Sequence, residues 1–306
     1  MDDGQEQCHT INGFRIRCTI WEHPGSPLAP CLILPAAGQS TAHVRGHVRH
    51  LAPHMTCGVV ELPGGVGADA LPVEHGPDFL ADGLRQVIDL CGLGPVNILG
   101  ISAGTMPAYL AALDHPDRIA RVALCGFHMV PDAAIEGGGE RAVRLLRAGR
   151  LGEWADEVVQ HLVCQDPDRT VRGRSMIGSL LRNRLVHSSP YEIGQQIRMM
   201  QRAVRHRNWF PGQGLRQPAL FFTGEHDTAT PPRASREAAA LCADARVAIV
   251  KEADHMVAVQ RPADVADLVT RFCSGASLEN LPYCHPVQYF GSATPEATSS
   301  SAPAPA

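Results

Sequence analysis

The stretch Val-Asn-Ile-Leu-Gly-Ile-Ser-Ala-Gly, residues 96–104, determines how the rest of the chain is interpreted. Its first four residues are typical of a short buried strand, and a helical pattern follows from residue 105. A Gly-x-Ser-x-Gly sequence between a strand and a helix predicts a nucleophile elbow, a sharp turn that holds the serine in a strained backbone conformation. Side chains at Gly100 or Gly104 would collide with the neighbouring strand or helix. The turn therefore exposes the Ser102 hydroxyl at a sheet edge, above a helix N-terminus whose amides favour developing negative charge.

Short apolar runs and helical patterns alternate on both sides of this turn. Strand-like runs cover residues 14–21, 31–34, 57–62, 121–124, 219–223 and 246–250. Helical patterns cover residues 42–51, 78–91, 105–114, 232–242 and 262–272. Short apolar strands that alternate with longer helices predict an α/β fold, with a mostly parallel sheet covered by helices on both faces.

One long segment interrupts the alternation. Residues 128–217 contain four helical patterns, at 140–150, 153–163, 175–184 and 191–207, and no convincing strand. Such a block between two strand–helix halves predicts an inserted helical cap over the carboxyl edge of the sheet, where open α/β sheets bind ligands. The expected organisation is a core of residues 11–127 and 218–275, a cap of residues 128–217, a C-terminal extension of residues 276–291 and a disordered tail of residues 292–306.

Two later stretches supply the groups that activate a serine. The strand at 219–223 runs into a turn that presents Asp227, and the strand at 246–250 is followed by a short loop that reaches His255. We expect Ser102 to attack an acyl carbonyl, and His255 to take and return the proton. Asp227 would fix the imidazole tautomer and stabilise the imidazolium. The alternative acids are Glu225, Asp254 and, less favoured, Asp132.

The acyl transition state also needs two backbone N–H donors, an oxyanion hole. One is expected from Ala103, directly after the nucleophile, and the other from Ala37, in the small-residue loop after the strand at 31–34. Gln39 and Ser40 are candidates for substrate contact, although both also suit the start of the following helix. The candidates for the wall of an adaptable acyl tunnel, or alternatively for ordinary cap core, are Met199 and Met200.

With these residues in this order, the chain resembles the α/β-hydrolase superfamily along most of its length. Within it, the loop at 35–41, the cap segment at 189–196 and the C-terminal segment at 284–291 are similar to the bacterial 3-(3-hydroxyalkanoyloxy)alkanoate synthases of rhamnolipid biosynthesis. Ser102, Asp227 and His255 fall on the triad positions of that family. The elbow here lacks the tryptophan of the family's version. The resemblance implies an α/β-hydrolase fold and an acyl transfer that joins two 3-hydroxyacyl units through an ester.

Charge is unevenly distributed along the chain. The 306 residues carry a formal net charge of −4, which gives no sign of a nucleic-acid or membrane-surface protein. Residues 141–216 contain 14 arginines, no lysine and six acidic residues, so the predicted cap has a net charge of +8. A basic cap beside a nucleophile would attract an acidic acyl carrier protein or a coenzyme A thioester. The alternative is that these arginines are solvated side chains on long surface helices.

The expected location of the protein follows from what the sequence lacks. No apolar run is long enough to cross a bilayer, and the polar, acidic N-terminus has no feature of a secretory signal. The ten cysteines include no Cys-x-x-Cys pair, as expected for reduced and mostly buried thiols. We therefore expect a cytoplasmic protein with no membrane span and no nucleic-acid partner.

One competing motif suggests a metal. His43, His47, His50 and His54 fall on one face of a helix, the spacing that a metal site requires. However, Pro53 interrupts the last turn, and no aspartate or glutamate accompanies the set. We expect neither a metal nor another cofactor.

The leading functional hypothesis is acyl transfer through an acyl-Ser102 intermediate, from a (hydroxy)acyl thioester of coenzyme A or acyl carrier protein to a hydroxyl acceptor. The first alternative is an esterase or thioesterase, in which water is the acceptor; the choice depends on whether the cap excludes water. The second, from another class, is a non-catalytic scaffold that binds a ligand or a carrier protein.

Overall fold

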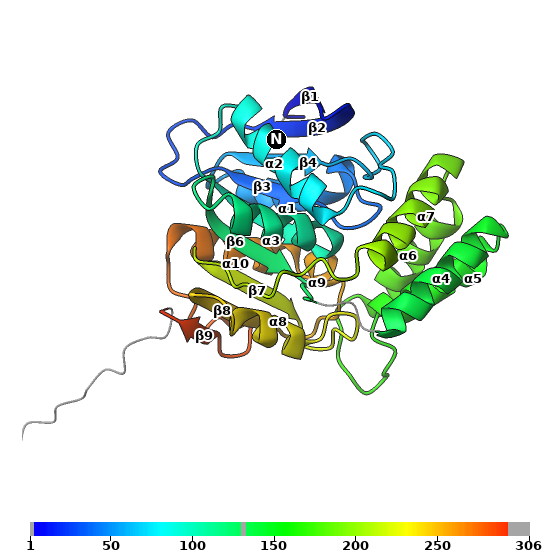
Figure 1. Ribbon diagram of the computed structural model, residues 1–306. Helices are drawn as coiled ribbons and strands as arrows, with labels where there is room; N and C mark the ends of the chain where they lie inside the picture. Colours follow the sequence, from blue (N-terminus) through cyan, green and yellow to red (C-terminus); the bar gives the residue numbers. More distant parts are fainter. Residues whose placement is uncertain (1–2, 130–132, 293–306) are drawn as a thin grey trace, which may run out of the picture.

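The computed structural model describes residues 3–129 and 133–292, and in this part of the chain nine strands form one sheet (Figure 1). The sheet order is β1-β2-β4-β3-β5-β6-β7-β8-β9. Strands β3 to β8 are parallel to their neighbours among themselves, whereas β2 joins β4, β1 joins β2 and β9 joins β8 in antiparallel register. The predicted, mostly parallel sheet is therefore confirmed. The strands are β1 (Gln5–Ile11), β2 (Phe14–Trp21), β3 (Cys31–Leu34), β4 (Cys57–Glu61), β5 (Val96–Ile101), β6 (Ile119–Cys125), β7 (Ala219–Gly224), β8 (Asp244–Val250) and β9 (Gln288–Gly291).

Helices cover both faces of this sheet, because the central strands are apolar on both sides. In β3, Leu32 and Leu34 enter one core layer, while Cys31 and Ile33 enter the other. A strand that is buried on both faces reads as a continuous apolar run, which is how the sequence identified it. The first layer is covered by α2 (Pro77–Leu90), α3 (Thr105–Asp114) and α8 (Pro232–Ala239), and the second by α1 (Thr41–Leu51) and α10 (Pro262–Ser274).

The segment between β6 and β7 contains helices and no described strand. Its four helices form a group beside the sheet, on the right-hand side of Figure 1. They have a small core of their own around the buried indole of Trp154. We call this group the helical cap; it consists of α4 (Ala133–Arg147), α5 (Leu151–Leu162), α6 (Arg174–Val186) and α7 (Pro190–Arg205).

The two edge strands are the main additions to the sequence-based picture. β1 is mostly polar and pairs with β2 across Asn12 and Gly13, both of which have positive φ (50° and 83°). An Asn-Gly pair between two strands is a strong hairpin signal that the sequence carried and that the apolar-run criterion missed. β9 lies within the predicted C-terminal extension and pairs with β8. The predicted disordered tail lies outside the described residues, apart from Ser292.

Two further observations complete the fold. All ten cysteines are free thiols, and eight of them are buried, in line with the prediction from their spacing. No helix in the described ranges is long and apolar enough to span a membrane.

The elbow glycine nearest β3 gives a test of the packing. A Cβ atom at Gly104 would lie 2.4 Å from the carbonyl oxygen of Leu34, so Gly104→Ala must push α3 away from β3. We expect a loss of about 1–3 kcal/mol in the free energy of unfolding, measured by urea denaturation. The same substitution at Gly46, an exposed position inside α1 with open space around it, should instead stabilise the protein by up to about 1 kcal/mol. Equal effects at the two sites would contradict this account.

Candidate active site

Ser102 lies at the sharp turn between β5 and α3. It begins a single 3-10 turn, Ser102–Gly104, and has a φ of +49°, in the left-handed region that non-glycine residues rarely adopt. The hydroxyl of Thr105 donates a hydrogen bond to the Ser102 carbonyl oxygen at 2.5 Å. Gly100 leaves room for the turn, since a Cβ atom there would lie 2.8 Å from the Gly104 oxygen. The strain is therefore held by packing on both sides of the serine.

The structure brings the serine, histidine and aspartate of the sequence hypothesis into one chain of hydrogen bonds. Ser102 Oγ lies 3.0 Å from His255 Nε2, and His255 Nδ1 lies 2.9 Å from Asp227 Oδ2. The three residues follow β5, β8 and β7, whose carboxyl ends meet at one edge of the sheet because the strands are parallel. This geometry is within the range in which a base can take a proton from a hydroxyl nucleophile.

Two threonines hold the Asp227 carboxylate in place. Thr230 donates to Asp227 Oδ1 from its backbone N–H and to Oδ2 from its hydroxyl, both at 2.7 Å. The hydroxyl of Thr223 donates to Oδ2 as well. The sequence analysis did not identify either threonine, because a polar residue at a strand end or in a turn carries no distinctive pattern. Together they fix the side chain that orients His255.

Burial and charge act in opposite directions on the histidine and the aspartate. Burial alone would lower the pKa of His255, but the charge of Asp227 and the hydrogen bond to it raise this pKa above its ordinary value. Burial would raise the pKa of Asp227, but the charge of His255 and the hydrogen bonds lower it below its ordinary value. The side chain of Asp227 is fully buried and that of His255 is 7% exposed, so water screens this pair weakly.

The alternative acids have other partners. The buried carboxylate of Asp254 accepts hydrogen bonds from the Cys164 amide at 2.9 Å, from the Met256 amide at 2.9 Å and from the Gln260 side chain at 2.8 Å. Glu225 accepts from the Glu252 amide and from His285, both at 2.6 Å, and the described structure shows no hydrogen bond between it and Ser102 or His255. Asp132, the third alternative, lies outside the described residues.

The loop after β3 forms a tight turn beside Ser102. The Gln39 amide donates to the Ala36 carbonyl oxygen at 3.0 Å, and Gly38, inside the turn, has a φ of +67°. Ala37 and Ala103 both line the cavity next to Ser102. In the described structure the Ala37 amide has no hydrogen-bond partner, and the Ala103 amide belongs to the first helical turn, where N–H groups lack intrahelical acceptors. Both amides are therefore free to donate to a ligand.

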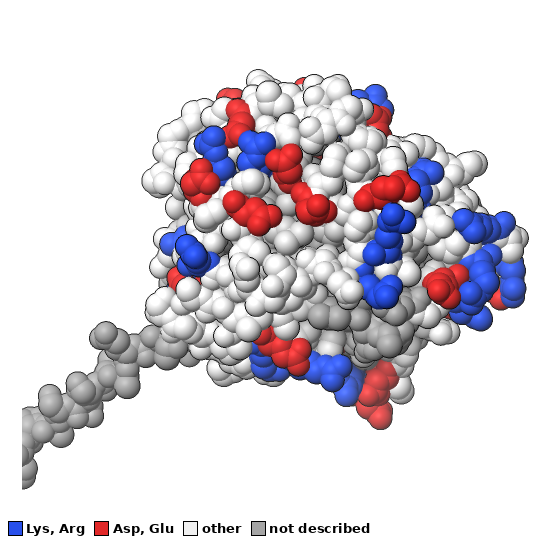
Figure 2. Space-filling view, in the orientation of Figure 1, with Lys and Arg blue, Asp and Glu red and all other residues white. Residues whose placement is uncertain are grey.

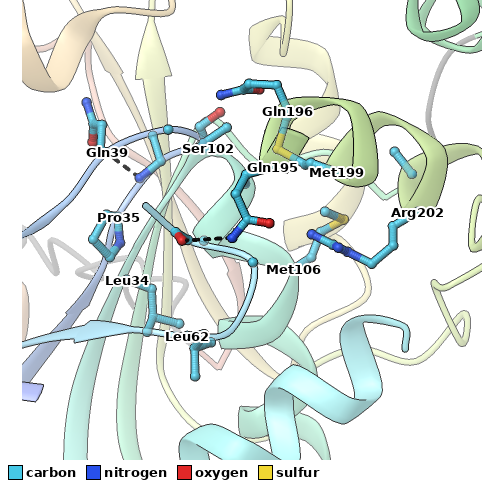
Figure 3. A pocket seen from close by; sticks show the side chains of 18 of the residues that line it. Leu34, Pro35, Gln39, Leu62, Ser102, Met106, Gln195, Gln196, Met199 and Arg202 are labelled. Atoms are coloured by element: carbon cyan, nitrogen blue, oxygen red, sulfur yellow. Dashed lines mark hydrogen bonds between the residues drawn. The ribbon is translucent and has the colours of Figure 1, made fainter. Parts of the chain in front are cut away.

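A cavity of about 340 Å³ lies between this edge of the sheet and the cap. Ser102 and His255 line it from the core side, and Met199 and Met200 from α7. Figure 3 shows Gln196, Met199 and Arg202 projecting from α7, opposite Ser102 and Gln39. The volume falls in the range of small-molecule sites.

Of the two polar residues expected to contact substrate, only one lines this cavity. Gln39 does, and its side-chain oxygen also accepts a hydrogen bond from the Ala36 amide at 3.3 Å. Ser40 does not line it: the residue precedes α1, and its amide and hydroxyl lie 3.1 Å and 3.0 Å from His43 Nδ1. Its role is to start the helix, the other possibility that the sequence had left open.

Helix α7 is attached to the core by side chains that donate to backbone carbonyls. The acceptors all lie in residues 65–73, a segment that begins in the cavity lining with Gly65 and Val66. The sequence predicted a helix at residues 191–207, and no pattern in it distinguished these four polar side chains. The pairs are Tyr191 with Ala68, Gln195 with Gly65, Arg202 with Leu71 and His206 with Val73.

Two histidines that the sequence analysis did not single out also line the cavity with His255. They are His128, after β6, and His161, at the end of α5. Burial lowers the pKa of both, and the positive charge of His255 lowers it further. They therefore add polar surface near the serine without adding positive charge at neutral pH.

The four spaced histidines of the metal alternative diverge in the structure. His47 is buried in the core, where burial and the nearby His50 lower its pKa to about 4. His43 contacts Ser40, whereas His50 and His54 are exposed. Within the described ranges, no three His, Cys, Asp or Glu side chains come together as metal ligands.

Comparisons with known proteins agree with this architecture. The family model described as "alpha/beta hydrolase fold" matches residues 30–262. A comparison with curated proteins finds no match. Among solved structures, the chain is similar to MGS-M2, an alpha/beta hydrolase enzyme from a Medee basin deep-sea metagenome library, with 14% identity, a TM-score of 0.75, and coverage of 90% of this chain and 99% of that one.

Two further solved structures are similar over nearly their whole length. The enol-lactonase from Burkholderia xenovorans LB400 has 20% identity and a TM-score of 0.74, with coverage of 88% of this chain and 100% of that one. The thermophilic esterase from Thermogutta terrifontis has 20% identity and a TM-score of 0.71, with coverage of 89% and 99%. At these identities the likeness demonstrates a shared fold.

The raised pKa of His255 gives a pH test. A fluorophosphonate should label Ser102 at a rate that rises with pH as His255 loses its proton, with a midpoint above the ordinary histidine value of 6.5. In Asp227→Asn the charge that raises the pKa is gone while burial remains, so the midpoint should move to lower pH. The measurement is the labelling rate by mass spectrometry between about pH 5 and 9, a window chosen around the histidine range. An unchanged midpoint in the variant would contradict the assigned cause.

Proposed function

The chain belongs to the alpha/beta hydrolase fold family, and from that premise we propose that it cleaves an ester or thioester through an acyl intermediate on Ser102. The observation that carries the proposal is the Ser102–His255–Asp227 chain of hydrogen bonds, which opens into the cavity under the cap. A buried serine that merely packs in the core would need neither the strained turn nor a paired histidine.

In the first half-reaction, Ser102 Oγ forms a bond to the substrate carbonyl carbon while its proton passes to His255 Nε2. The amides of Ala37 and Ala103 donate to the oxygen that becomes negative. Asp227 accepts the hydrogen bond from Nδ1 and stabilises the positive imidazolium. The carbon–oxygen or carbon–sulfur bond to the leaving group then breaks, and His255 returns its proton to that leaving group.

In the second half-reaction, an acceptor attacks the acyl-Ser102 carbonyl. His255 takes the proton from the acceptor and then gives it to Ser102 Oγ as the acyl–serine bond breaks. With water as the acceptor the product is a free acid, and with a hydroxyl acceptor it is a new ester. Hydrolysis is the better supported, because solved structures of the same fold include a protein named as an esterase and one named as an enol-lactonase.

Transfer from a thioester to a hydroxyl acceptor is the second candidate, and the charge of the cap favours it. Figure 2 shows basic side chains gathered where the cap helices lie, with fewer acidic ones among them. Six of the 14 cap arginines form ion pairs with carboxylates. Arg147, Arg205 and Arg216 are exposed and have no carboxylate within ion-pairing distance in the described structure. Such side chains suit an acidic acyl carrier protein or the phosphates of coenzyme A, and the resemblance to the 3-(3-hydroxyalkanoyloxy)alkanoate synthases remains a prediction of the same kind.

The acyl-enzyme proposal is tested by labelling the serine. A fluorophosphonate should modify Ser102 in the folded protein and leave Ser102→Ala unmodified. Asp227→Asn should slow this labelling by up to about 10⁴-fold, the effect of losing the orienting carboxylate in a triad. Asp254→Asn is the matched control: it should lower the free energy of unfolding by about 1–3 kcal/mol, because a buried acceptor is lost, while labelling of the folded protein continues.

The result that would overturn the proposal is an unmodified Ser102 in folded protein. That outcome would favour the non-catalytic scaffold, which binds a ligand or carrier protein without chemistry. If the labelling rate of Ser102 fell further in Asp254→Asn than in Asp227→Asn, Asp254 and not Asp227 would be the acid that orients His255.

The choice between acceptors is tested with one 3-hydroxyacyl group carried on coenzyme A and, separately, on neutral N-acetylcysteamine. Mass spectrometry should find free acid if water is the acceptor and an ester-linked dimer if a hydroxyl is. If the cap binds the carrier, kcat/KM for the coenzyme A thioester should exceed that for the neutral thioester, and should fall with added salt and in Arg147→Glu. Equal values for the two thioesters at low salt would reject carrier binding.

A further inference from the structure

Two arginines line the cavity, and their surroundings differ. Arg202, on α7, donates a hydrogen bond to the Leu71 carbonyl oxygen at 2.9 Å and packs against Gly64. Burial and the neighbouring Arg198 lower its pKa to about 10. The hydrogen bond to Leu71 attaches α7 to the core, and this accounts for the position of Arg202. Its guanidinium already has a partner in the protein.

Arg184, near the end of α6, has no such explanation. Its guanidinium lies against the turn after β3, with Nη2 3.3 Å from the place where a Cβ atom of Gly38 would be. In the described part of the chain the Arg184 guanidinium makes no hydrogen bond and no ion pair within 4 Å, although the backbone carbonyl of Arg184 accepts from the His187 amide. It is half-buried, and burial lowers its pKa. A cation that is partly withdrawn from water without a partner costs free energy that an anion in the cavity would offset.

The neighbouring charged groups do not supply that anion. Glu192 acts on Arg184 through its charge, but its Oε2 atom is held by the amide and hydroxyl of Ser189, each at 2.8 Å. His43 also faces this corner, and its pKa is lowered by burial and by the charge of Arg184, so it is neutral at neutral pH. The Arg184 guanidinium lies against Gly38, and in the described part of the chain it forms no ion pair with Glu192, although both residues line the cavity.

Other donors gather at the same place. The Gln196 side-chain nitrogen lies 2.7 Å from the same Cβ position at Gly38. The oxygen of Gln39 accepts from the Ala36 amide, which leaves the NH₂ group of Gln39 to donate elsewhere. The Arg184 guanidinium and the amide groups of Gln39 and Gln196 therefore border one corner of the cavity. The other lining residues are largely apolar, including Leu62, Met106, Met199 and Met200, but the carboxylates of Glu61 and Glu192 and several histidines line the cavity as well.

This corner is one residue away from Ala37, whose amide we assign to the oxyanion hole. We propose that Arg184 binds a carboxylate of the substrate, so that the ester cleaved at Ser102 belongs to a molecule with a second, ionised carboxyl group a few bonds from the reacting carbonyl. The inference rests on the proposed acyl-Ser102 chemistry for its placement of the carbonyl. Arginine suits this role because its planar fork makes two parallel hydrogen bonds to a carboxylate. The phosphates of coenzyme A are separated from the thioester by a long arm, and therefore do not reach a group this close to the carbonyl.

The test compares charged esters with neutral esters of the same shape. In the first pair, monoethyl succinate carries a carboxylate on the acyl side of the ester and ethyl 4-methylpentanoate is its neutral counterpart. In the second pair, carboxymethyl butyrate carries the carboxylate on the alcohol side and isobutyl butyrate is its neutral counterpart. We expect the ratio of kcat/KM, charged to neutral, to fall by about 10- to 100-fold in Arg184→Met for one of the two pairs, as for the loss of a hydrogen bond to a charged group. The pair that responds identifies the side of the ester that carries the carboxylate. Arg184→Lys, which keeps the charge and loses the fork, should give an intermediate ratio.

The matched control is Arg182→Met, two residues earlier on α6. Arg182 pairs with Asp156 on the surface of the cap and does not line the cavity, so its loss should leave both ratios unchanged. Fluorophosphonate labelling of Ser102 in each variant shows that the site is still assembled. If labelling is normal and the ratios in Arg184→Met equal those of the wild type, the carboxylate proposal is overturned while the acyl-Ser102 proposal stands.

A binding measurement separates this inference from catalysis. In Ser102→Ala, isothermal titration calorimetry should detect monoethyl succinate or carboxymethyl butyrate, and the added change Arg184→Met should weaken that binding by at least about 10-fold. If Ser102 is never labelled but this loss of binding is seen, the proposed chemistry fails and the anion site survives. Absence of binding to both probes in Ser102→Ala would overturn the anion site.

Discussion

The contact between Gly104 and the backbone of Leu34 is the constraint on which the rest of the site depends. A side chain at 104 would lie 2.4 Å from the Leu34 oxygen, so the start of α3 can rest against the end of β3 only as glycine. Leu34 is the last residue before the turn that contains Ala37. The same contact therefore seats the left-handed Ser102 and places it beside the loop that we assign to the oxyanion hole.

In the site itself, burial and charge have opposite effects on the pKa values of His255 and Asp227. Burial alone would leave His255 a poor base and Asp227 a reluctant anion, but each stabilises the charged form of the other. Thr223 and Thr230 make this pairing specific, because their hydrogen bonds fix the carboxylate before His255 is protonated. A preorganised site of this kind spends little free energy on reorganisation when charge develops.

The cap adds a second set of constraints. Three side chains of α7, and His206 directly after it, donate to carbonyl oxygens of residues 65–73, so the helix and this segment together form one wall of the cavity. Glycine in this segment also serves packing: a Cβ atom at Gly67 would overlap the carboxylate of the buried Glu61, whose other oxygen accepts the amide of Thr41 at 2.7 Å. Arg184 of α6 meets Gly38 at another corner of the same cavity, and this is where we propose that a substrate carboxylate binds.

The sequence by itself determined most of the architecture and singled out Ser102 as the candidate nucleophile. Apolar runs on strands that are buried on both faces, helical periodicity and the Gly-x-Ser-x-Gly turn are local properties, and each predicted its element closely. The polar edge strands β1 and β9 escaped the same criterion, because one side of each is exposed and the pairing partner supplies the order.

Only the tertiary structure distinguishes Asp227 from Asp254 as the partner of His255. It also places Arg184 in the lining of the cavity, next to Gly38. Asp227 and Asp254 both follow a strand, and no local pattern separates them. What separates them is the hydrogen bond from Cys164, 90 residues away, which engages Asp254, and the approach of His255 to Asp227. In the sequence, Arg184 was one of 14 arginines between residues 141 and 216, and what distinguishes it is its contact with Gly38, which lies far away along the chain. The role of a charged side chain is set by which groups surround it, and those groups are brought together only by the packing of the cap on the sheet.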